Sequence, residues 1–324
     1  MDTAVASRKT VLVTGAAGGL GLRLVARLIA AGWKVKGLAL PGDPLARKLE
    51  FLGCEVLEAD VRDPASLLAV FDGIDTVYHL AAIIVSHDPA VFRSVNRDGT
   101  ANVVAAASRA GVRHFIYVSS ASVTYPHPTP YSDSKRQAEA IVRAEHSFAH
   151  TIVRPTLVYD ESGGLELSMF ASYLERFPIV PFIGRGDAQK RPVWSEDLVD
   201  GLVRIAGNEK AYGKTYNLSG GEAIAMRDFA RLVLEHRGSS KRFVYLPVAL
   251  CRGVAMVLGW LMKKPPLTSS AIAGIVQDAN LDPSDAIRDL GYHPVGVREG
   301  FQHCLPIAAK PAAIDRFLRT RSTR

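Results

Sequence analysis

The alternation of two sequence patterns between residues 10 and 155 constrains the fold of this chain more than any other feature. Short apolar runs typical of buried strands alternate with longer segments that have helical periodicity. Strands separated by helices in this rhythm pair in parallel through right-handed crossovers. Because the strands are nearly continuous apolar runs, helices are expected on both faces of the sheet. The sequence therefore predicts a doubly wound α/β fold with a parallel sheet.

The rhythm also predicts the domain organisation. The expected strands are 10–15, 34–40, 54–60, 74–82, 114–120 and 150–155, and the expected helices are 21–32, 44–53, 64–73, 89–110 and 131–147. Beyond residue 155 Pro and Gly become frequent, and the chain from residue 247 is mostly helical. We therefore expect a first domain of residues 1–160 and a smaller lobe of residues 161–324, of which about 190–220 return to the first domain.

Composition limits the classes of partner and compartment. The 324 residues are 48% hydrophobic and 22% charged, which is typical of a globular protein. The net charge of +7 comes from scattered Lys and Arg, so no nucleic-acid partner is expected. Cys54, Cys251 and Cys304 lie far apart, which predicts neither a disulfide framework nor a metal site. Residues 1–10 lack an apolar signal core, so a cytoplasmic location is expected.

The segment LPVALCRGVAMVLGWLM, residues 246–262, is unusually apolar. It is shorter than the ~20 residues that span a bilayer, and it contains Arg252. A partly buried helix of the smaller lobe is the favoured interpretation, and shallow contact with a membrane is the alternative.

The segment VTGAAGGLG places Gly15, Gly18 and Gly21 three residues apart, between the first strand and the first helix. The three glycines permit a tight turn, close approach of a pyrophosphate, and close packing of the helix on the sheet. The helix start offers free N–H groups to phosphates. A plain strand–helix turn is the alternative, but the position favours dinucleotide binding and makes the smaller lobe the substrate-binding part.

The segment YSDSK places Tyr131 and Lys135 on one face of a helix, about 6 Å apart along its axis. A lysine ammonium there favours the phenolate of Tyr131 and lowers its pKa from the free value of about 10. Such a tyrosine can exchange a proton with an alcohol or carbonyl oxygen. Ser120, which ends the preceding strand, can hold that oxygen. The alternatives are a surface pair and a serine that caps a turn.

Several motifs resemble those of one superfamily. The G-x-x-G-x-x-G spacing resembles that of the short-chain dehydrogenase/reductases. ADVRD, HLAA and VNRDGTANVVAAASRAGVRHFIYVSS resemble their extended branch, the NAD-dependent epimerase/dehydratases. TIVRPTLVY, RPVWSEDLVDGL and KTYNLSGGEAIAMRDFARLV match that branch as well. The resemblance extends from about residue 10 to 305, and it is not specific for a substrate.

The resemblance implies roles for individual residues. Ser120, Tyr131 and Lys135 are implied to be catalytic, with Lys135 also bonding the nicotinamide ribose, and Asn96 is implied to fix a helix kink and a proton-relaying water. Asp60 is implied to contact the adenine. The full set implied for cofactor binding is Gly15, Gly18, Gly19, Leu20, Gly21, Asp60, Val61, Leu80, Ala81, Ala82, Tyr131, Lys135, Pro155 and Val158. A homodimer through helices 89–110 and 131–147 is implied by analogy.

The sequence distinguishes only weakly between the nicotinamide cofactors NAD and NADP. The second strand ends at Ala39 and Leu40, so neither the acid that favours NAD nor the arginine that favours NADP stands there. Arg47 and Lys48 follow on a helix and could reach a 2′-phosphate. We expect NAD or NADP, with a slight preference for NAD.

Three functions remain open. The first is an oxidoreductase of a hydrophobic alcohol or ketone, resembling the 3β-hydroxysteroid dehydrogenase-like members. The second is a nucleotide-sugar epimerase. Residues 263–294 lack an evident diphosphate clamp, but Lys190 and Arg191 could bind a diphosphate. Dehydration is disfavoured because Ala121 and Ser122, not an acid, follow the catalytic serine. The third is a non-catalytic dinucleotide-binding regulator, but such relatives commonly lack the tyrosine and lysine.

Overall fold

The computed structural model describes residues 9–161, 164–262 and 265–304, and the chain divides into two compact units. Unit 1 comprises Met1–Pro155, Glu196–Leu218 and Leu281–His293. Unit 2 comprises Thr156–Ser195, Ser219–Asn280 and Pro294–Arg324. The sequence-based division at residue 160, with a return at about 190–220, did not include the return of 281–293.

Unit 1 contains a seven-stranded sheet in the order β11-β6-β5-β4-β1-β2-β3, and every neighbouring pair is parallel. The strands are β1 (Thr10–Thr14), β2 (Lys34–Ala39), β3 (Glu55–Glu58), β4 (Thr76–His79), β5 (His114–Val118), β6 (Ala149–Pro155) and β11 (Thr215–Leu218). The strand order reverses between β1 and β4, which opens a crevice at the carboxyl ends of those strands. The predicted doubly wound parallel sheet is confirmed.

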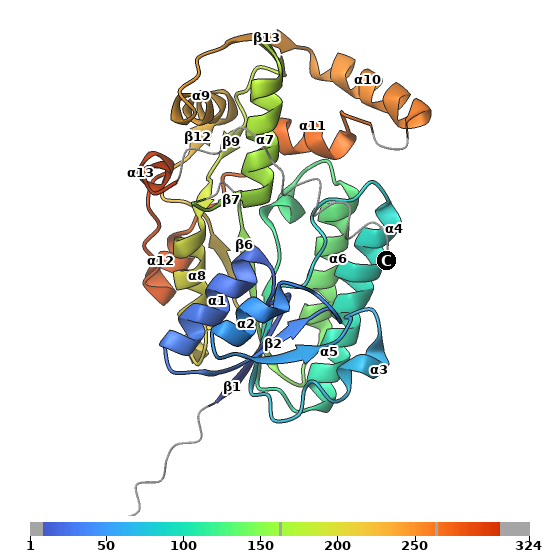
Figure 1. Cartoon of the computed structure of the whole chain (residues 1–324), viewed down its shortest axis with the longest axis vertical. Coiled ribbons are helices and arrows are strands. Elements are labelled where there is room, and N and C mark those ends of the chain that lie inside the picture. The colour runs from blue at the N-terminus through green and yellow to red at the C-terminus, as the bar shows by residue number, and fades with distance from the viewer. Residues whose placement is uncertain (1–8, 162–163, 263–264, 305–324) are drawn as a thin grey trace, which may run out of the picture. The chain divides into compact units, whose positions relative to one another are not determined.

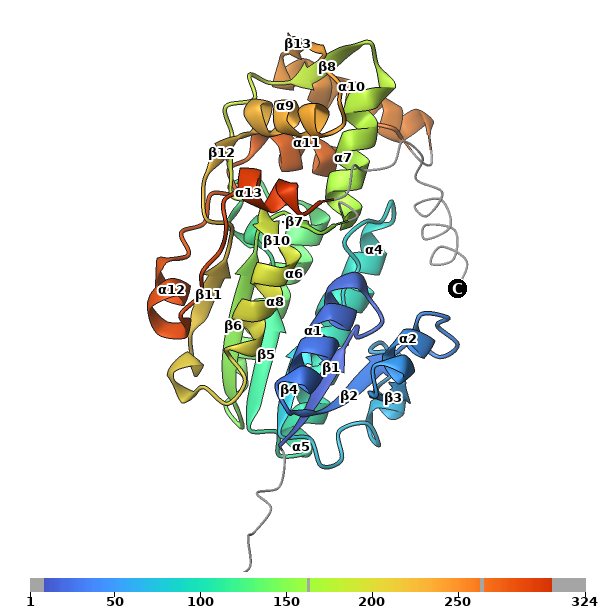
Figure 2. The same ribbon diagram turned by 60° about the vertical axis from the view of Figure 1, so that its left-hand side comes forward.

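Helices cover both faces of this sheet, as Figures 1 and 2 show. The helices of unit 1 are α1 (Gly19–Ala30), α2 (Ala46–Phe51), α3 (Pro64–Leu67), α4 (Pro89–Phe92), α5 (Gly99–Arg109), α6 (Pro130–Ala144), α8 (Ser195–Val203) and α12 (Ser284–Leu290). On one face α5 and α6 pack into a core with strand residues such as Leu12, Val77 and Phe115. On the other face the Tyr78 hydroxyl donates to the Leu202 carbonyl of α8 at 2.7 Å.

Two helices differ from expectation. The helix expected at 64–73 is the single turn α3, after which the chain continues through i→i+3 turns such as Val70 N to Leu67 O. The helix expected at 89–110 is divided by a π-helical segment, η1 (Arg93–Asp98), between α4 and α5. Short π-helical segments are rare and occur often at functional sites.

Unit 2 is built from helices and three two-stranded sheets. Its strands are β7 (Val158–Tyr159), β8 (Ile179–Ile183), β9 (Gln189–Lys190), β10 (Val193–Trp194), β12 (Ile224–Ala225) and β13 (Arg242–Leu246). Its helices are α7 (Gly164–Arg176), α9 (Met226–His236), α10 (Val248–Leu261), α11 (Ser269–Val276) and α13 (Val297–Gln302). A core of aromatic and aliphatic side chains from α7, α9 and α13, including Phe229 and Phe301, holds the unit together. The expected helical character after residue 247 is observed.

Candidate active site

The glycine loop follows β1 directly, at the crevice where the strand order reverses. Gly15 has φ +67°, and a Cβ there would lie 2.9 Å from the Ala81 nitrogen. A Cβ at Gly21 would lie 2.4 Å from the Gly15 carbonyl oxygen. Both positions therefore require glycine, as expected for a turn and a closely packed helix. Ala81 and its neighbours Leu80 and Ala82 follow β4 on the other side of the crevice.

The first helix begins at Gly19, two residues earlier than expected, with Gly18 as its N-cap. No side chain in the described part of the chain caps this start, so its first N–H groups remain available to an anion. A Cβ at Gly18 would meet only the Gly15 oxygen at 3.2 Å, and one at Gly19 would meet nothing within 4 Å. The loop and helix start thus form a cradle that fits the pyrophosphate of a dinucleotide.

A buried histidine, which the sequence reasoning missed, joins this loop to the π-helical segment. His79 Nδ1 lies 2.7 Å from Thr14 Oγ1, and His79 Nε2 lies 3.0 Å from Thr100 Oγ1. Thr100 Oγ1 donates its proton to the Asn96 carbonyl at 2.5 Å, so we assign the ring proton to Nε2. Burial, with a contribution from the charge of Lys135, lowers the pKa of His79 to about 3, so the ring is neutral.

Asn96 lies within η1 and is almost fully buried. Its Oδ1 accepts from the Ile83 nitrogen at 2.8 Å, and its Nδ2 donates to the Ile83 carbonyl at 2.9 Å and to Ser134 Oγ at 3.1 Å. The side chain therefore ties the loop after β4 to α6, on which Ser134 immediately precedes Lys135. This position agrees with the implied role of Asn96 at a helix irregularity.

The start of α6 is fixed by its sequence. Pro130 occupies the first turn, where a missing N–H costs nothing. Thr129 Oγ1 accepts from the Ser132 nitrogen at 3.1 Å, and Ser132 Oγ accepts from the Thr129 nitrogen at 2.7 Å, which is a capping box. This local structure sets the direction of Tyr131, whose ring lies edge-on to Phe92 of α4 at 6.0 Å.

Lys135 is 2% exposed and lies one turn beyond Tyr131 on α6. Its Nζ donates to the Val118 carbonyl at 2.7 Å and lies 4.3 Å from the centre of the Tyr117 ring. Burial lowers the pKa of Lys135 to about 7, and the charge of Glu139 opposes part of this shift. Because Lys135 is buried, it does not form a surface pair with Tyr131.

Glu139 continues the same face of α6 and is also buried. Its two carboxylate oxygens accept from Arg154 Nε at 2.9 Å and Nη2 at 2.6 Å. Burial opposes ionisation, but the hydrogen bonds from Arg154 hold the pKa of Glu139 below its ordinary value. The carboxylate is therefore charged at neutral pH and acts on Lys135 one turn away.

Ser120 stands just after β5, where the sequence placed it. Its Oγ accepts from the Ser122 nitrogen at 3.2 Å and lies 3.0 Å from Ser122 Oγ, so it caps a 3₁₀ turn. The turn-capping alternative is thus observed in the structure, and a second bond to a substrate oxygen is compatible with it. Ser119 is more deeply buried, with its nitrogen donating to the Val153 carbonyl at 2.7 Å.

The remaining predicted cofactor residues lie at different depths. Asp60 pairs with Arg62, whose Nε lies 2.9 Å from Asp60 Oδ2, and this bond lowers the pKa of Asp60. The Val61 side chain is buried in the core, and its carbonyl accepts from Asn102 Nδ2 at 2.9 Å. Pro155 ends β6 in unit 1. Val158 begins β7 and belongs to unit 2.

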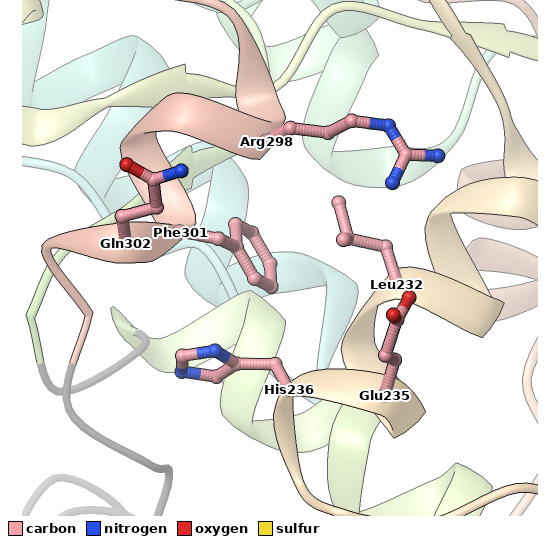
Figure 3. Close-up of a pocket in the computed structure, with 6 residues that line it drawn as sticks. All are labelled: Leu232, Glu235, His236, Arg298, Phe301 and Gln302. Carbon is pink, nitrogen blue, oxygen red and sulfur yellow. The ribbon is translucent and has the colours of Figure 1, made fainter.

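A separate hollow of about 250 Å³ lies between α9 and α13 in unit 2 (Figure 3). It is lined by Leu232, Glu235, His236, Arg298, Phe301 and Gln302. His236 packs edge-on against Phe301 at 5.3 Å, which places this imidazole in an aromatic contact. The residues that line this hollow all belong to unit 2.

Comparison with known proteins assigns the chain to a family. The sequence profile described as the NAD dependent epimerase/dehydratase family matches residues 11–219, which is more than half of the chain. The chain belongs to this family. The resemblance seen in the motifs is therefore confirmed, and the protein is an enzyme of the extended short-chain dehydrogenase/reductase type.

Individual relatives within this family are more distant. The chain is 29% identical to a 3 beta-hydroxysteroid dehydrogenase/Delta 5-->4-isomerase of Mycobacterium tuberculosis, over 91% of this chain and 89% of that protein. It is 35% identical to a ceramide reductase of Caulobacter vibrioides, over 55% of each chain. Its fold is similar to that of a UDP-glucuronic acid 4-epimerase from Bacillus cereus, solved with UDP-glucuronic acid and NAD. The TM-score of that match is 0.68 at 21% identity, and it covers 91% of this chain and 97% of that one.

Proposed function

We propose that the protein is an oxidoreductase that moves a hydride between NAD and the hydroxyl or ketone group of an apolar substrate, with Tyr131 as the proton donor and acceptor. The observation that carries this proposal is the burial of Lys135 one turn beyond Tyr131 on α6, where the Val118 carbonyl accepts a hydrogen bond from its Nζ at 2.7 Å. A buried lysine with a strongly lowered pKa is costly to the fold, and such groups concentrate at functional sites.

The residues of this chain divide the chemistry between them. The nicotinamide supplies hydride transfer at the substrate carbon. Tyr131 gives a proton to the substrate oxygen in reduction and removes one in oxidation. Lys135 in its charged form favours the phenolate of Tyr131. Ser120 donates a hydrogen bond to the same substrate oxygen, and Asn96 positions α6 through Ser134.

The two cations that could clamp a diphosphate are used within unit 2, which supports an apolar substrate. Lys190 is 4% exposed, and its Nζ donates to the carbonyls of Gly274, at 2.8 Å, and Gln277. Arg191 donates through Nε to Asn280 Oδ1 at 2.7 Å and through Nη1 to the carbonyls of Gly220 and Gly221, each at 3.2 Å. Steroid and ceramide relatives favour the same substrate class.

The charges around the second strand support NAD over NADP. Glu58 Oε1 accepts from the Gly42 nitrogen at 3.1 Å, so a carboxylate stands beside the loop that follows β2, and it would repel a 2′-phosphate. Arg62 is engaged by Asp60. Arg47 and Lys48 are exposed on α2.

A cytoplasmic location stays a prediction, based on three cysteines that are buried and unpaired.

A paired assay tests the substrate class. We expect the loss of NADH absorbance with a steroid or long-chain ketone, slower turnover with NADPH, and no heat of binding when UDP-glucose or UDP-glucuronic acid is titrated into the protein with NAD. Tight binding of a UDP-sugar without turnover of any apolar ketone would replace this proposal by the epimerase alternative. NAD binding without turnover of either class would favour the non-catalytic regulator.

A further inference from the structure

Helix α10 has two apolar faces, and unit 2 covers one of them. Cys251 and Ala255 are buried in a small cluster with Ile183 and Ile272, and Val248 packs against the same cluster. Figure 1 shows α10 beside α11, which contributes Ile272. These buried positions lie four residues apart, so they form one edge of the helix.

A second edge of α10, about 120° around the helix from the buried one, is apolar and exposed. Leu250, Val254, Val257 and Leu261 recur at spacings of four, three and four residues, which is the stripe expected on a packed face of an amphipathic helix. Their exposed fractions are 55%, 43%, 53% and 77%. Trp260, at 90%, lies beside this stripe. We call these five residues the α10 stripe. Apolar surface of this extent is a mark of an interaction site.

The segment of sequence that contains α10 carries charge of one sign. Residues 237–277 contain six Lys or Arg residues and no Asp or Glu. Arg237 is paired with Glu175, and Lys241 donates to three backbone carbonyls, so these two cations are used internally. Arg242 and Arg252 are exposed. Arg252 begins a row of four-residue spacing that continues with Met256 and Trp260, which are 64% and 90% exposed, so the exposed apolar surface of α10 borders a cation. An apolar surface of this kind, in a segment without acids, is complementary to anionic lipid.

We propose that the α10 stripe binds the surface of a bilayer that contains anionic lipids, with the helix lying in the plane of the interface. The helix has 14 residues, about 21 Å in length, which is shorter than the ~30 Å hydrocarbon core. No helix in the described ranges combines the length and hydropathy that crossing a bilayer requires. Trp260 at the end of the stripe suits the headgroup boundary, where aromatic side chains concentrate.

A second copy of the chain is a weaker fit for this face. A twofold interface opposes each surface patch to itself, so the Arg252 side chains of the two copies would both border a cationic interface. Residues 237–277 offer no acid to neutralise them. A lipid surface supplies the missing negative charge. This inference does not depend on the reaction proposed above, because its readout is binding.

Vesicle sedimentation tests the proposal. We expect the protein to sediment with vesicles of equal parts phosphatidylcholine and phosphatidylglycerol, and to do so weakly with phosphatidylcholine alone. Trp260→Ser combined with Leu261→Ser should weaken binding about ten-fold or more, because the largest exposed apolar groups are lost. Phe51→Ser is the matched control, because Phe51 is also 90% exposed but lies on α2 of unit 1. It should bind as the unchanged protein does.

The charge and the oligomeric state are tested separately. Arg252→Glu and added salt should each reduce binding to anionic vesicles several-fold. Sedimentation that is equal for the double variant and the Phe51 control would overturn the proposal. A dimer in solution that the double variant abolishes, without any vesicle binding, would also overturn it and assign the α10 stripe to self-association.

Discussion

Two opposing effects, from α6 and the elements packed around it, set the pKa of Lys135. Burial favours the neutral amine, whereas the Glu139 carboxylate one turn away favours the ammonium. Glu139 is itself held ionised by Arg154. The pKa of about 7 places the charge change of Lys135 close to neutrality.

Replacing Tyr131 by Phe isolates its proton transfer. The variant keeps the ring and its edge-on contact with Phe92, so the fold should persist. Turnover should fall by about 10²–10⁴-fold, the usual contribution of a general acid or base, while NAD affinity changes little. Stopped-flow or steady-state NADH absorbance measures the first quantity and calorimetry the second. Tyr212→Phe, in a half-buried tyrosine whose ring lies tilted against His114 at the other end of β5, is the matched control. Near-native turnover in Tyr131→Phe would make YSDSK a structural feature only.

Lys135→Met should stabilise the protein while it inactivates it. The unfolded chain binds a proton on this lysine below pH 10.5, whereas the folded protein binds it only below about pH 7. The native state therefore loses stability as pH falls from 10.5 to about 7, and the loss is constant below that. Methionine removes this cost, so the free energy of unfolding should rise by roughly 2–4 kcal/mol near neutral pH, after allowance for the lost bond to Val118.

Urea unfolding measured between pH values of about 7 and 10.5 checks the sign of this pH dependence of stability. The difference between Lys135→Met and the unchanged protein should shrink as pH rises toward 10.5. Lys48→Met is the control, because Lys48 is exposed on α2, and it should show no such trend. A Lys135→Met variant that is less stable than the unchanged protein, by the same free energy of unfolding at every pH, would contradict the burial cost assigned to this lysine.

At the scale of elements, the π-helical segment η1 shows where local pattern is insufficient. The apolar periodicity of residues 89–110 predicts one continuous helix, and it contains no Pro that would break the centre. The bonds that hold η1 are long-range: Asn96 bonds to Ile83 and to Ser134 of α6. The Asn96 carbonyl is bound by Thr100, which in turn contacts His79. The stretch that begins VNRDGT pointed to Asn96, but nothing in the sequence pattern identified its partners.

Gly18→Val tests the cradle formed by the glycine loop and α1. The backbone at Gly18 has φ −72°, which any residue adopts, and the new Cβ would meet only the Gly15 oxygen at 3.2 Å. The fold should therefore survive, with unfolding temperature nearly unchanged, while the added side chain blocks the pyrophosphate and abolishes NAD binding. Gly253→Val in α10, where nothing lies within 4 Å, should bind NAD normally. Tight calorimetric binding by folded Gly18→Val would move the dinucleotide site elsewhere.

At the scale of the whole molecule, the sequence predicted most of the sheet, because each buried strand is a local apolar run followed by a helix. The positions of Tyr131 and Lys135 on one face of α6 and of the glycine loop before α1 were also predicted, since spacing within one element carries that signal, and their roles stay predictions. The return of 281–293 to unit 1 was not predicted. A short helix such as α12 has no local mark of the unit it packs on, and that is decided by contacts such as Tyr216 Oη with Asp289 at 3.2 Å.

The discontinuity of unit 1 has a consequence for its biogenesis. A ribosome completes β6 at Pro155 but must still synthesise about sixty residues of other structure before β11, the neighbour of β6, begins at Thr215. At about 5–20 residues per second, the nascent sheet therefore presents an unpaired edge for several seconds. We expect chains stalled near residue 160 to be protease-sensitive and to recruit chaperones, and chains stalled beyond residue 293 to be protected. Protection already complete at residue 160 would show that the first six strands mature without the returning segments.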